Sequence, residues 1–219
     1  MIVLDIEASG LDSGKCGIWQ IGALDLESKE EFLEEARIDD EDEIFEEALK
    51  VIGKREEELR DSKKQSQKEL IERFLEWLKR FDERILMGQN IGWDMSFIQN
   101  KCIRYGIHDK FRKITGQRTI DLHTIANLIY KDKYGEFKTE KGKSSMSLSS
   151  ILEFCGLKDE RREMEGGEVV KEGKPHNALE DCKLEAECYF RLVHGKNLFE
   201  EYSKFKIPEH LLEKSKEGK

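Results

Sequence analysis

The sequence has no closely spaced cysteine pair, no long apolar run and no excess of positive charge. Its five cysteines are scattered without a C-x-x-C pair, which argues against a disulfide framework and favours reduced thiols. No apolar run approaches the length that spans a bilayer. The net charge of −9 excludes a generally basic surface for nucleic acid, although local basic patches and bound metals can reverse the field where it matters.

A secretory signal and internal repeats are also missing. The first apolar stretch contains Asp5 and Glu7, which the apolar region of a signal peptide would not tolerate. At 219 residues, with 37% hydrophobic content, the chain is long enough for one domain with a substantial core. We therefore expect a globular cytoplasmic protein with no membrane association.

The apolar pattern predicts an α/β fold with a mixed sheet. Strand-like runs occupy residues 2–6, 18–26, 30–38, 84–88 and 118–121. Helical periodicity covers residues 43–81, 94–105, a segment ending near 130, a short capped helix over 148–154, and 177–194. Residues 131–145 and 158–174 are polar and are predicted to be loops. We expect a domain over residues 1–195 and a charged appendage over 196–219 that packs weakly or frays at its end.

Four carboxylates and one histidine stand at positions where a site would need them. Asp5 and Glu7 project from the same face of the first strand, because side chains alternate along a strand. Two adjacent like charges resist desolvation unless cations, a positive partner or water surround them. Asp94 stands at the start of a predicted helix, Asp181 lies in the last long helix, and His176 precedes that helix.

These segments resemble the DEDDh family of 3′–5′ exonucleases, which includes the proofreading exonucleases of DNA polymerases and RNase T. The first family motif matches residues 5–11, Asp-Ile-Glu-Ala-Ser-Gly-Leu; the second matches Asn90 and Asp94; the third, His-x4-Asp, matches His176 and Asp181. Related DEDDy enzymes have a tyrosine four residues before the last aspartate, where this chain has Asn177. The resemblance covers about residues 1–194. It implies an RNase H-like fold, with a mixed five-stranded sheet whose first three strands are antiparallel, flanked by helices.

The resemblance implies that Asp5, Glu7, Asp94 and Asp181 hold two divalent cations, Mg²⁺ or Mn²⁺, with Asp5 bridging both. Hard divalent cations would also relieve the repulsion among four carboxylates that converge at one edge of a sheet. His176 would be the general base that takes the proton of the attacking water, because an imidazole titrates near neutral pH. The implied reaction is hydrolysis of the terminal phosphodiester with release of nucleoside 5′-monophosphates.

Substrate contacts are expected from the turn after the first strand and from the second motif. Small residues in that turn let backbone N–H groups approach a ribose and phosphate. Trp93 and Phe97 either stack a base or belong to the core, and Asn90 either orients the scissile end or caps the following helix. Trp19 and Gln20 are expected to be strand packing, and Asp121 to be a helix cap. The predicted substrate-binding residues are Ala8, Ser9, Gly10, Leu11, Asn90, Trp93, Phe97 and His176.

Single-stranded 3′-ends are the expected substrate, with DNA favoured and RNA as the second candidate, because a duplex end must fray before its last phosphate reaches a recessed site. Lysines in the two polar loops either contact phosphates or are simply solvated; they are Lys138, Lys141, Lys143, Lys171 and Lys174. A polymerase or other processing partner and a homodimer stay open. So do two other classes: a catalytically silent nucleic-acid-binding or interaction domain on the same fold, and an acidic metal-binding protein without nuclease activity.

Overall fold

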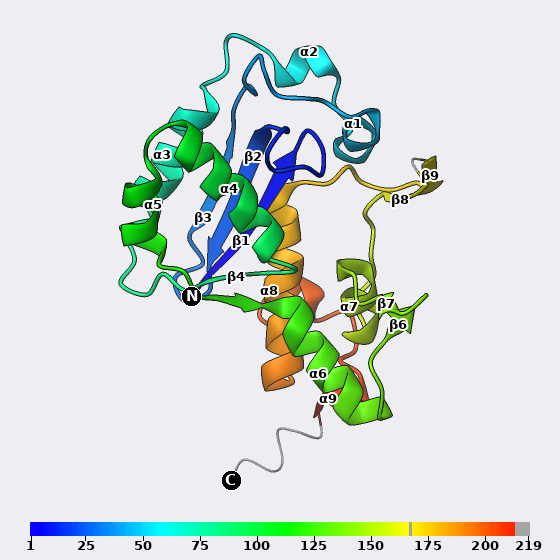
Figure 1. The fold of residues 1–219 in the computed structure, drawn as a ribbon. Helices are drawn as coiled ribbons and strands as arrows, with labels where there is room; N and C mark the ends of the chain where they lie inside the picture. The colour runs from blue at the N-terminus through cyan, green and yellow to red at the C-terminus, as the bar shows by residue number, and fades with distance from the viewer. Residues whose placement is uncertain (167, 213–219) are drawn as a thin grey trace.

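The structure is a computed structural model that describes residues 1–166 and 168–212. A five-stranded sheet in the order β3-β2-β1-β4-β5 forms its centre (Figure 1). The strands are β1 (Ile2–Ala8), β2 (Ile18–Asp25), β3 (Glu31–Glu35), β4 (Leu86–Gly88) and β5 (Thr119–Asp121). The pairs β1–β2 and β2–β3 are antiparallel, whereas β1–β4 and β4–β5 are parallel. The predicted mixed sheet with three antiparallel strands at the start of the chain is confirmed.

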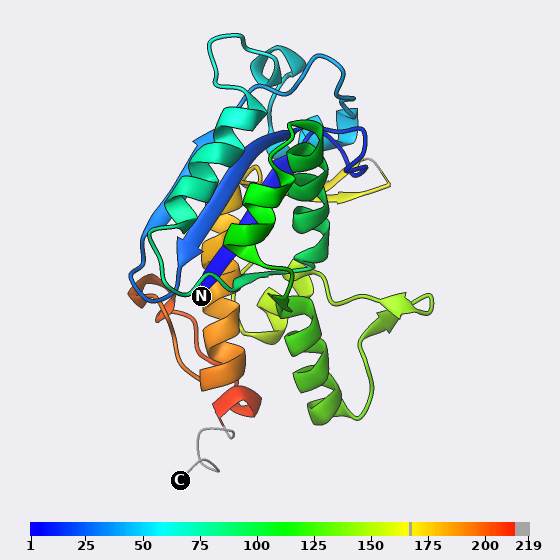
Figure 2. The same ribbon diagram turned by 60° about the vertical axis from the view of Figure 1, so that its left-hand side comes forward.

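Helices cover both faces of the sheet (Figure 1, Figure 2). On one face α8 (Ala178–His194) packs against β1, β2 and β3, while α3 (Gln67–Leu78) and α4 (Gly92–Arg104) pack on the other. No helix in the described part of the chain is long and apolar enough to cross a membrane. The other helical elements are α1 (Glu46–Ile52), α2 (Glu56–Leu59), α5 (His108–Thr115), α6 (Leu122–Tyr134), α7 (Leu148–Phe154), η1 (Glu200–Tyr202) and α9 (Glu209–Leu212).

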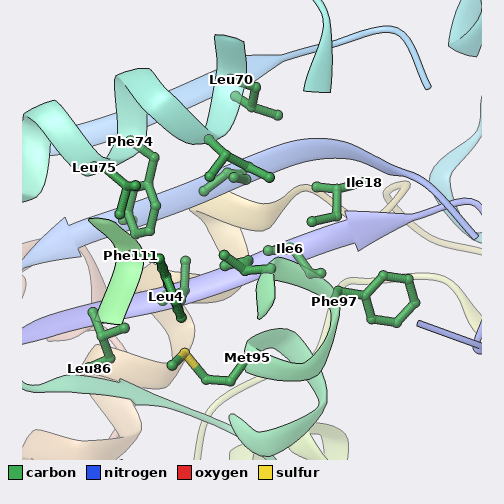
Figure 3. Packing of buried hydrophobic residues seen from close by; sticks show 14 of the residues in the cluster. Leu4, Ile6, Ile18, Leu70, Phe74, Leu75, Leu86, Met95, Phe97 and Phe111 are labelled. Atoms are coloured by element: carbon green, nitrogen blue, oxygen red, sulfur yellow. The ribbon is translucent and has the colours of Figure 1, made fainter. Parts of the chain in front are cut away.

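The side chains of β1 alternate between these two faces. Leu4 packs in the main hydrophobic cluster with side chains of α3 and α4 (Figure 3). Val3 packs instead in a cluster that contains Cys182 of α8. Because Asp5 and Glu7 continue the alternation from Val3, they lie on the face that α8 covers.

The start of α8 is held against β2 by a close backbone approach. Gly22 of β2 is paired with Asp5 of β1. A β-carbon on Gly22 would lie 2.3 Å from the Ala178 carbonyl carbon and 2.4 Å from the Leu179 nitrogen. The Gln20 side-chain oxygen accepts a 2.9 Å hydrogen bond from the Ala178 N–H. These contacts set the first turns of α8 directly over the acidic part of β1.

The end of β4 leaves room for a side chain of α4 at the edge of β1. Parallel pairing with β4 reaches only as far as Val3 of β1. Further along, the Ile6 N–H donates a 3.1 Å hydrogen bond to Asp94 Oδ1. Gly88 lets the end of β4 lie close to the β1 backbone, because a β-carbon there would lie 2.6 Å from the Leu4 carbonyl oxygen.

The two predicted loops contain short hairpins, so the loop prediction was wrong for part of their length. Residues 131–145 continue α6 to Tyr134 and then form β6 (Thr139–Glu140) and β7 (Lys143–Ser144). Residues 158–174 contain β8 (Glu163–Glu165) and β9 (Glu168–Lys171). Ladders of two to four residues leave too few apolar positions for alternation to be visible in a charged sequence.

A buried ion pair attaches the described part of the appendage, residues 196–212, to α8. Arg191 Nε lies 2.9 Å from Glu187 Oε1, and both side chains are fully buried. The pair also bonds the backbone of the appendage: Arg191 donates to the carbonyls of Tyr202 and Phe205, and Glu187 accepts from the N–H groups of Leu198 and Phe199. The attachment is therefore tighter than the weak packing expected. The division at residue 195 stays a prediction, and the fraying end, 213–219, lies outside the described residues.

Replacing Gly22 with alanine is expected to destabilise the protein by about 1–3 kcal/mol, because its methyl group would meet helix backbone that cannot rotate away. Urea denaturation in the presence of a chelator measures this change. Gly92→Ala is the control, since a β-carbon there meets nothing within 4 Å; it should be neutral or slightly stabilising. Equal midpoints for the Gly22 variant and the parent would contradict the close approach.

Candidate active site

The acids of the three sequence motifs meet beside the first turns of α8. One ligand atom from each of Glu7, His176 and Asp181 lies within 4.8 Å of the others, which is close enough for a single metal ion. Asp5 and Asp94 belong to the same group, because the charge of Asp94 and that of Asp181 both act on the Asp5 carboxyl. Residues from β1, α4 and α8 are thus brought to one place.

Burial and mutual repulsion disfavour the charged forms of these carboxyls. Burial raises the pKa of Asp5 and of Glu7 well above the ordinary range, and the nearby Asp94 and Asp181 charges raise both further. Burial also raises the pKa of Asp94 to about 8, despite the hydrogen bond from the Ile6 N–H. These carboxyls can all be ionised at neutral pH without a large cost in free energy only if positive charge is placed beside them.

Unpaired oxygens show that the group fits a divalent cation. Among the described residues, Asp181 Oδ1 and Glu185 Oε2 are buried polar atoms with no hydrogen-bond partner. Carboxylate oxygens, with one imidazole beside them, form a donor set typical of Mg²⁺ or Mn²⁺. The five cysteines are all buried and none forms a disulfide, as expected of reduced thiols. None of them belongs to the candidate metal-binding group.

Arg161 is the positive side chain that contacts the acidic group. Its Nη1 lies 3.2 Å from Asp181 Oδ2, while its Nε and Nη2 hold the two oxygens of Asp159 at 3.0 and 2.9 Å. Burial opposes its charge, but Asp181 and Asp159 raise the pKa of the guanidinium, so that it stays positive. Arg161 therefore offsets part of the negative charge at Asp181.

His176 is held by backbone groups from α1 and from the segment before β8. Its N–H donates to the Val51 carbonyl at 3.2 Å, and its ring Nε2 lies 3.0 Å from the Arg162 carbonyl oxygen. Since a carbonyl oxygen only accepts, Nε2 is assigned as the protonated nitrogen. The other ring nitrogen, Nδ1, lies 3.5 Å from Asp181 Oδ2 and therefore faces the carboxylates.

An apolar pocket of about 500 Å³ opens beside Glu7. Leu11 is 85% exposed at its rim, and its carbonyl oxygen accepts a 3.4 Å hydrogen bond from Trp93 Nε1. The pocket has the size and polarity to receive a flat, mostly apolar ring next to the acids. The lining residues are Glu7, Ala8, Gly10, Leu11, Asp12, Phe45, Glu47, Ala48, Val51, Ile52 and Trp93.

Some predicted substrate contacts are not placed at this pocket. The Ser9 hydroxyl is buried, donates to the Glu43 carbonyl at 2.6 Å and accepts from the Gly17 N–H at 2.8 Å, so that it stabilises the turn instead. The Phe97 ring is fully buried in the main cluster, with its centroid 4.5 Å from that of Trp93. It supports the Trp93 ring and does not face the pocket.

Asn90 does not cap α4, so the cap alternative is wrong, and its role in orienting the scissile end stays a prediction. It precedes the residue at the cap position, is exposed, and has a left-handed backbone with φ of 57°. Its N–H donates to Asp121 Oδ1 at 3.0 Å, and Asp121 also accepts from the His123 N–H as the predicted cap of α6.

The sequence interpretation missed the residues that support the site from outside the motifs. Gln20 does not merely pack in a strand but bonds the first N–H of α8, whereas Trp19 is buried packing as expected. Arg161 stands in a charged segment without any motif. Glu185 did carry a signal, because it is an acid next to the apolar positions Cys182 and Ala186 of α8 and lies four residues after Asp181.

The fold and the acidic site together define an exonuclease domain. The family model described as "RNase_T: Exonuclease" matches residues 2–189, and the chain therefore belongs to this exonuclease family. Its fold is the RNase H-like fold of the DEDDh exonucleases, as the resemblance predicted. A search of curated proteins finds no match to this sequence.

Solved structures of exonucleases share the fold at low sequence identity. A 3′-exonuclease in a structure titled as recognising a histone mRNA stem-loop is 16% identical with a TM-score of 0.60, over 90% of this chain and 64% of that one. E. coli Exonuclease I with a dT13 oligonucleotide is 16% identical with a TM-score of 0.62, over 84% of this chain and 39% of that one. The nuclease domain of 3′hExo, a DEDDh family member bound to rAMP, is 17% identical with a TM-score of 0.57, over 95% of both chains. The chain thus spans less than two thirds of the first two structures.

Without divalent metal, stability is expected to fall as pH rises from about 4, the ordinary value for an aspartate, to about 8, the value for Asp94 in the fold. Over this range folded Asp94 holds a proton that the unfolded chain has lost, which destabilises the fold by up to about 1.4 kcal/mol per pH unit. Urea denaturation in a chelator at several pH values measures the slope.

Asp94→Asn is the matched control for this prediction, because an amide oxygen can still accept from the Ile6 N–H. The slope of stability against pH should become flatter in this variant, and Mg²⁺ or Mn²⁺ should restore stability at pH 8 in the parent alone. Identical slopes for the parent and the variant would contradict the raised pKa.

Proposed function

We propose that this chain is a metal-dependent 3′–5′ exonuclease that hydrolyses the terminal phosphodiester of single-stranded 3′-ends and releases nucleoside 5′-monophosphates. The observation that carries this proposal is the convergence of Asp5, Glu7, Asp94 and Asp181 with His176 beside an apolar pocket, in a chain of the exonuclease family.

Asp5, Glu7, Asp94 and Asp181 would hold two divalent cations, Mg²⁺ or Mn²⁺. When bound, such cations lower the pKa of a water molecule and stabilise the charge that develops on the leaving oxygen. The chain supports this arrangement by presenting an unpaired Asp181 oxygen. Arg161 holds the other oxygen of Asp181 and fixes the orientation of that carboxylate.

His176 would act as the general base. Its Nε2 is committed to the Arg162 carbonyl, so Nδ1 is the nitrogen that faces the acidic group and is available to take a proton. The backbone bonds to α1 and to the segment before β8 restrict the ring, which limits the entropy lost when the attacking water is aligned.

The terminal nucleotide would place its base in the apolar pocket. Leu11 at the exposed rim is positioned to lie against the base, and Trp93 offers a ring that packs against Phe97. Glu7 lines the same pocket, so a base held there would bring its phosphate next to the acids.

Single-stranded DNA is the substrate that we favour, with RNA as the second candidate. The related structures include both kinds of nucleic acid: Exonuclease I is in complex with a dT13 oligonucleotide, and the 3′-exonuclease recognises a histone mRNA stem-loop. A recessed phosphate site favours an end that is already unpaired. A polymerase, another processing partner or a second copy of the chain would supply any processivity.

Asp5→Asn is expected to lower the single-turnover rate on a labelled 3′-end by about 10²-fold or more, because it removes a charged oxygen that would hold the metal. His176→Ala should lower the same rate by about 10²–10⁴-fold, as expected for a general base. The assay follows mononucleotide release in Mg²⁺ or Mn²⁺, with chelator as the blank, on matched single-stranded DNA, single-stranded RNA and blunt duplex.

Asp82→Asn is the matched control, because it removes an exposed aspartate between α3 and β4 without touching the acidic group. The parent and this control should both release mononucleotides faster from single strands than from the duplex. A folded parent that binds 3′-ends but releases no nucleotide would instead support the silent binding domain. Metal-induced stabilisation without binding or hydrolysis would support the metal-binding alternative.

The β6–β7 hairpin is the part of the chain best placed to contact the rest of the strand. Figure 2 shows this yellow-green hairpin projecting from the body of the molecule. Its base adjoins the ends of β4 and β5, because the Gln89 amide donates to the Met146 carbonyl at 3.4 Å and Ser144 Oγ lies 2.9 Å from His123 Nε2. A strand leaving the site past β4 would therefore meet the lysines of the hairpin.

Replacing Lys138, Lys141 and Lys143 with alanine is expected to raise KM on single strands and to flatten its dependence on salt. For each phosphate that is no longer neutralised by a lysine, the slope of log affinity against log salt should fall by about 0.7. A control with the same change in charge is the triple variant Lys68→Ala, Lys79→Ala and Lys113→Ala, which changes exposed lysines on α3, at its C-terminal cap and on α5. Equal slopes for the hairpin variant and the parent would show that these lysines are only solvated.

A further inference from the structure

Glu185 is a buried carboxylate that none of the three sequence motifs contains. It lies four residues after Asp181 on α8, so both side chains project from the same side of the helix. Glu185 is 1% exposed and Asp181 is 4% exposed. Its neighbours on this face include Cys182 and Ala186, which pack against Val3 of β1.

The contacts of Glu185 leave one oxygen without a partner. The Gln89 N–H, immediately after β4, hydrogen-bonds the carboxylate and favours its charged form. The second oxygen, Oε2, is buried and has no hydrogen-bond partner in the described part of the chain, as is also true of Asp181 Oδ1. A buried carboxylate oxygen without a partner is expensive, and two of them one helical turn apart indicate that something else is meant to bind there.

Electrostatics place Glu185 inside the acidic group. Burial raises its pKa well above the ordinary range, followed by the charges of Asp94 and Asp181. For Asp5, burial has the largest effect, and the charges of Asp94, Asp181, Glu185 and Glu7 raise its pKa further. Glu185 therefore acts on the same carboxyl as the acids of the motifs.

We propose that Glu185 is a fifth carboxylate of the metal centre, and that its unpaired Oε2 completes the oxygen set around the divalent cation held by Asp5 and Asp181. This inference rests on the proposed function, because it adds a residue to the same centre. Its chemistry is that of a hard, negatively charged oxygen ligand, so the ion concerned is Mg²⁺ or Mn²⁺. If Glu185 were only a neutral acid bonded to Gln89, an amide would replace it without effect on metal binding.

Isothermal titration of metal-free protein with Mn²⁺, in the absence of nucleic acid, tests the proposal. Glu185→Gln keeps an oxygen that can accept from the Gln89 N–H but removes the charge. Its Kd for Mn²⁺ should rise by about 10-fold or more, and its Mn²⁺-induced rise in Tm should shrink. Its Tm without metal should equal or exceed that of the parent, because the amide is neutral at every pH and avoids the cost of burying a carboxylate.

Glu180→Gln is the matched control, since it removes an exposed carboxylate one residue before Asp181, and its Kd should equal that of the parent. Asp5→Asn shows the weakening expected when an accepted ligand is removed. If the parent and Asp5→Asn bind Mn²⁺ equally, or neither binds, the proposed function itself fails. If Asp5→Asn binds weakly while Glu185→Gln binds like the parent, only the role of Glu185 is overturned. Should Glu185→Gln not fold, Glu185→Asp is judged by the same Kd criterion.

Discussion

Burial of several carboxylates within reach of one another, where β1 meets α8, is the constraint on which this structure depends. Asp5, Glu7, Asp94, Asp181 and Glu185 all have raised pKa values, with burial as the largest cause. The only described positive group that lowers several of these values is the Arg161 guanidinium, which contacts Asp181. One guanidinium cannot neutralise five acids, so the fold keeps an electrostatic strain that divalent cations would relieve.

That strain can persist because the elements around it are tightly attached elsewhere. The missing β-carbon at Gly22 and the Gln20 amide hold the start of α8 against β2. The far half of the same helix is tied to the appendage by Glu187 and Arg191, which are fully buried. The rest of the fold therefore contributes the stability that the acidic group lacks, as is common at sites built for binding or catalysis.

The position of His176 connects the apolar pocket with the segment before β8. Val51, which accepts from the His176 N–H, also lines the pocket, and Arg162, which accepts from the ring, follows Arg161. Anything bound in the pocket against α1 would thus lie next to the element that holds the imidazole. Asp159 and Arg162, in a segment with no regular sequence pattern, position Arg161 and the histidine ring.

The sequence alone determined the order of the main strands and helices along the chain and the identity of the motif acids, because period-two alternation and the three spaced motifs are local properties. Alternation put Asp5 and Glu7 on one face, and the helix caps at Ser147 and Asp121 followed from residue type. Only the tertiary structure decided that Arg161 and Glu185 join these acids, that the Ser9 hydroxyl and the Phe97 ring are buried, and that α1 forms a wall of the pocket. Such outcomes depend on contacts between distant segments, and no local pattern records which side chains a close approach such as that at Gly22 will bring together.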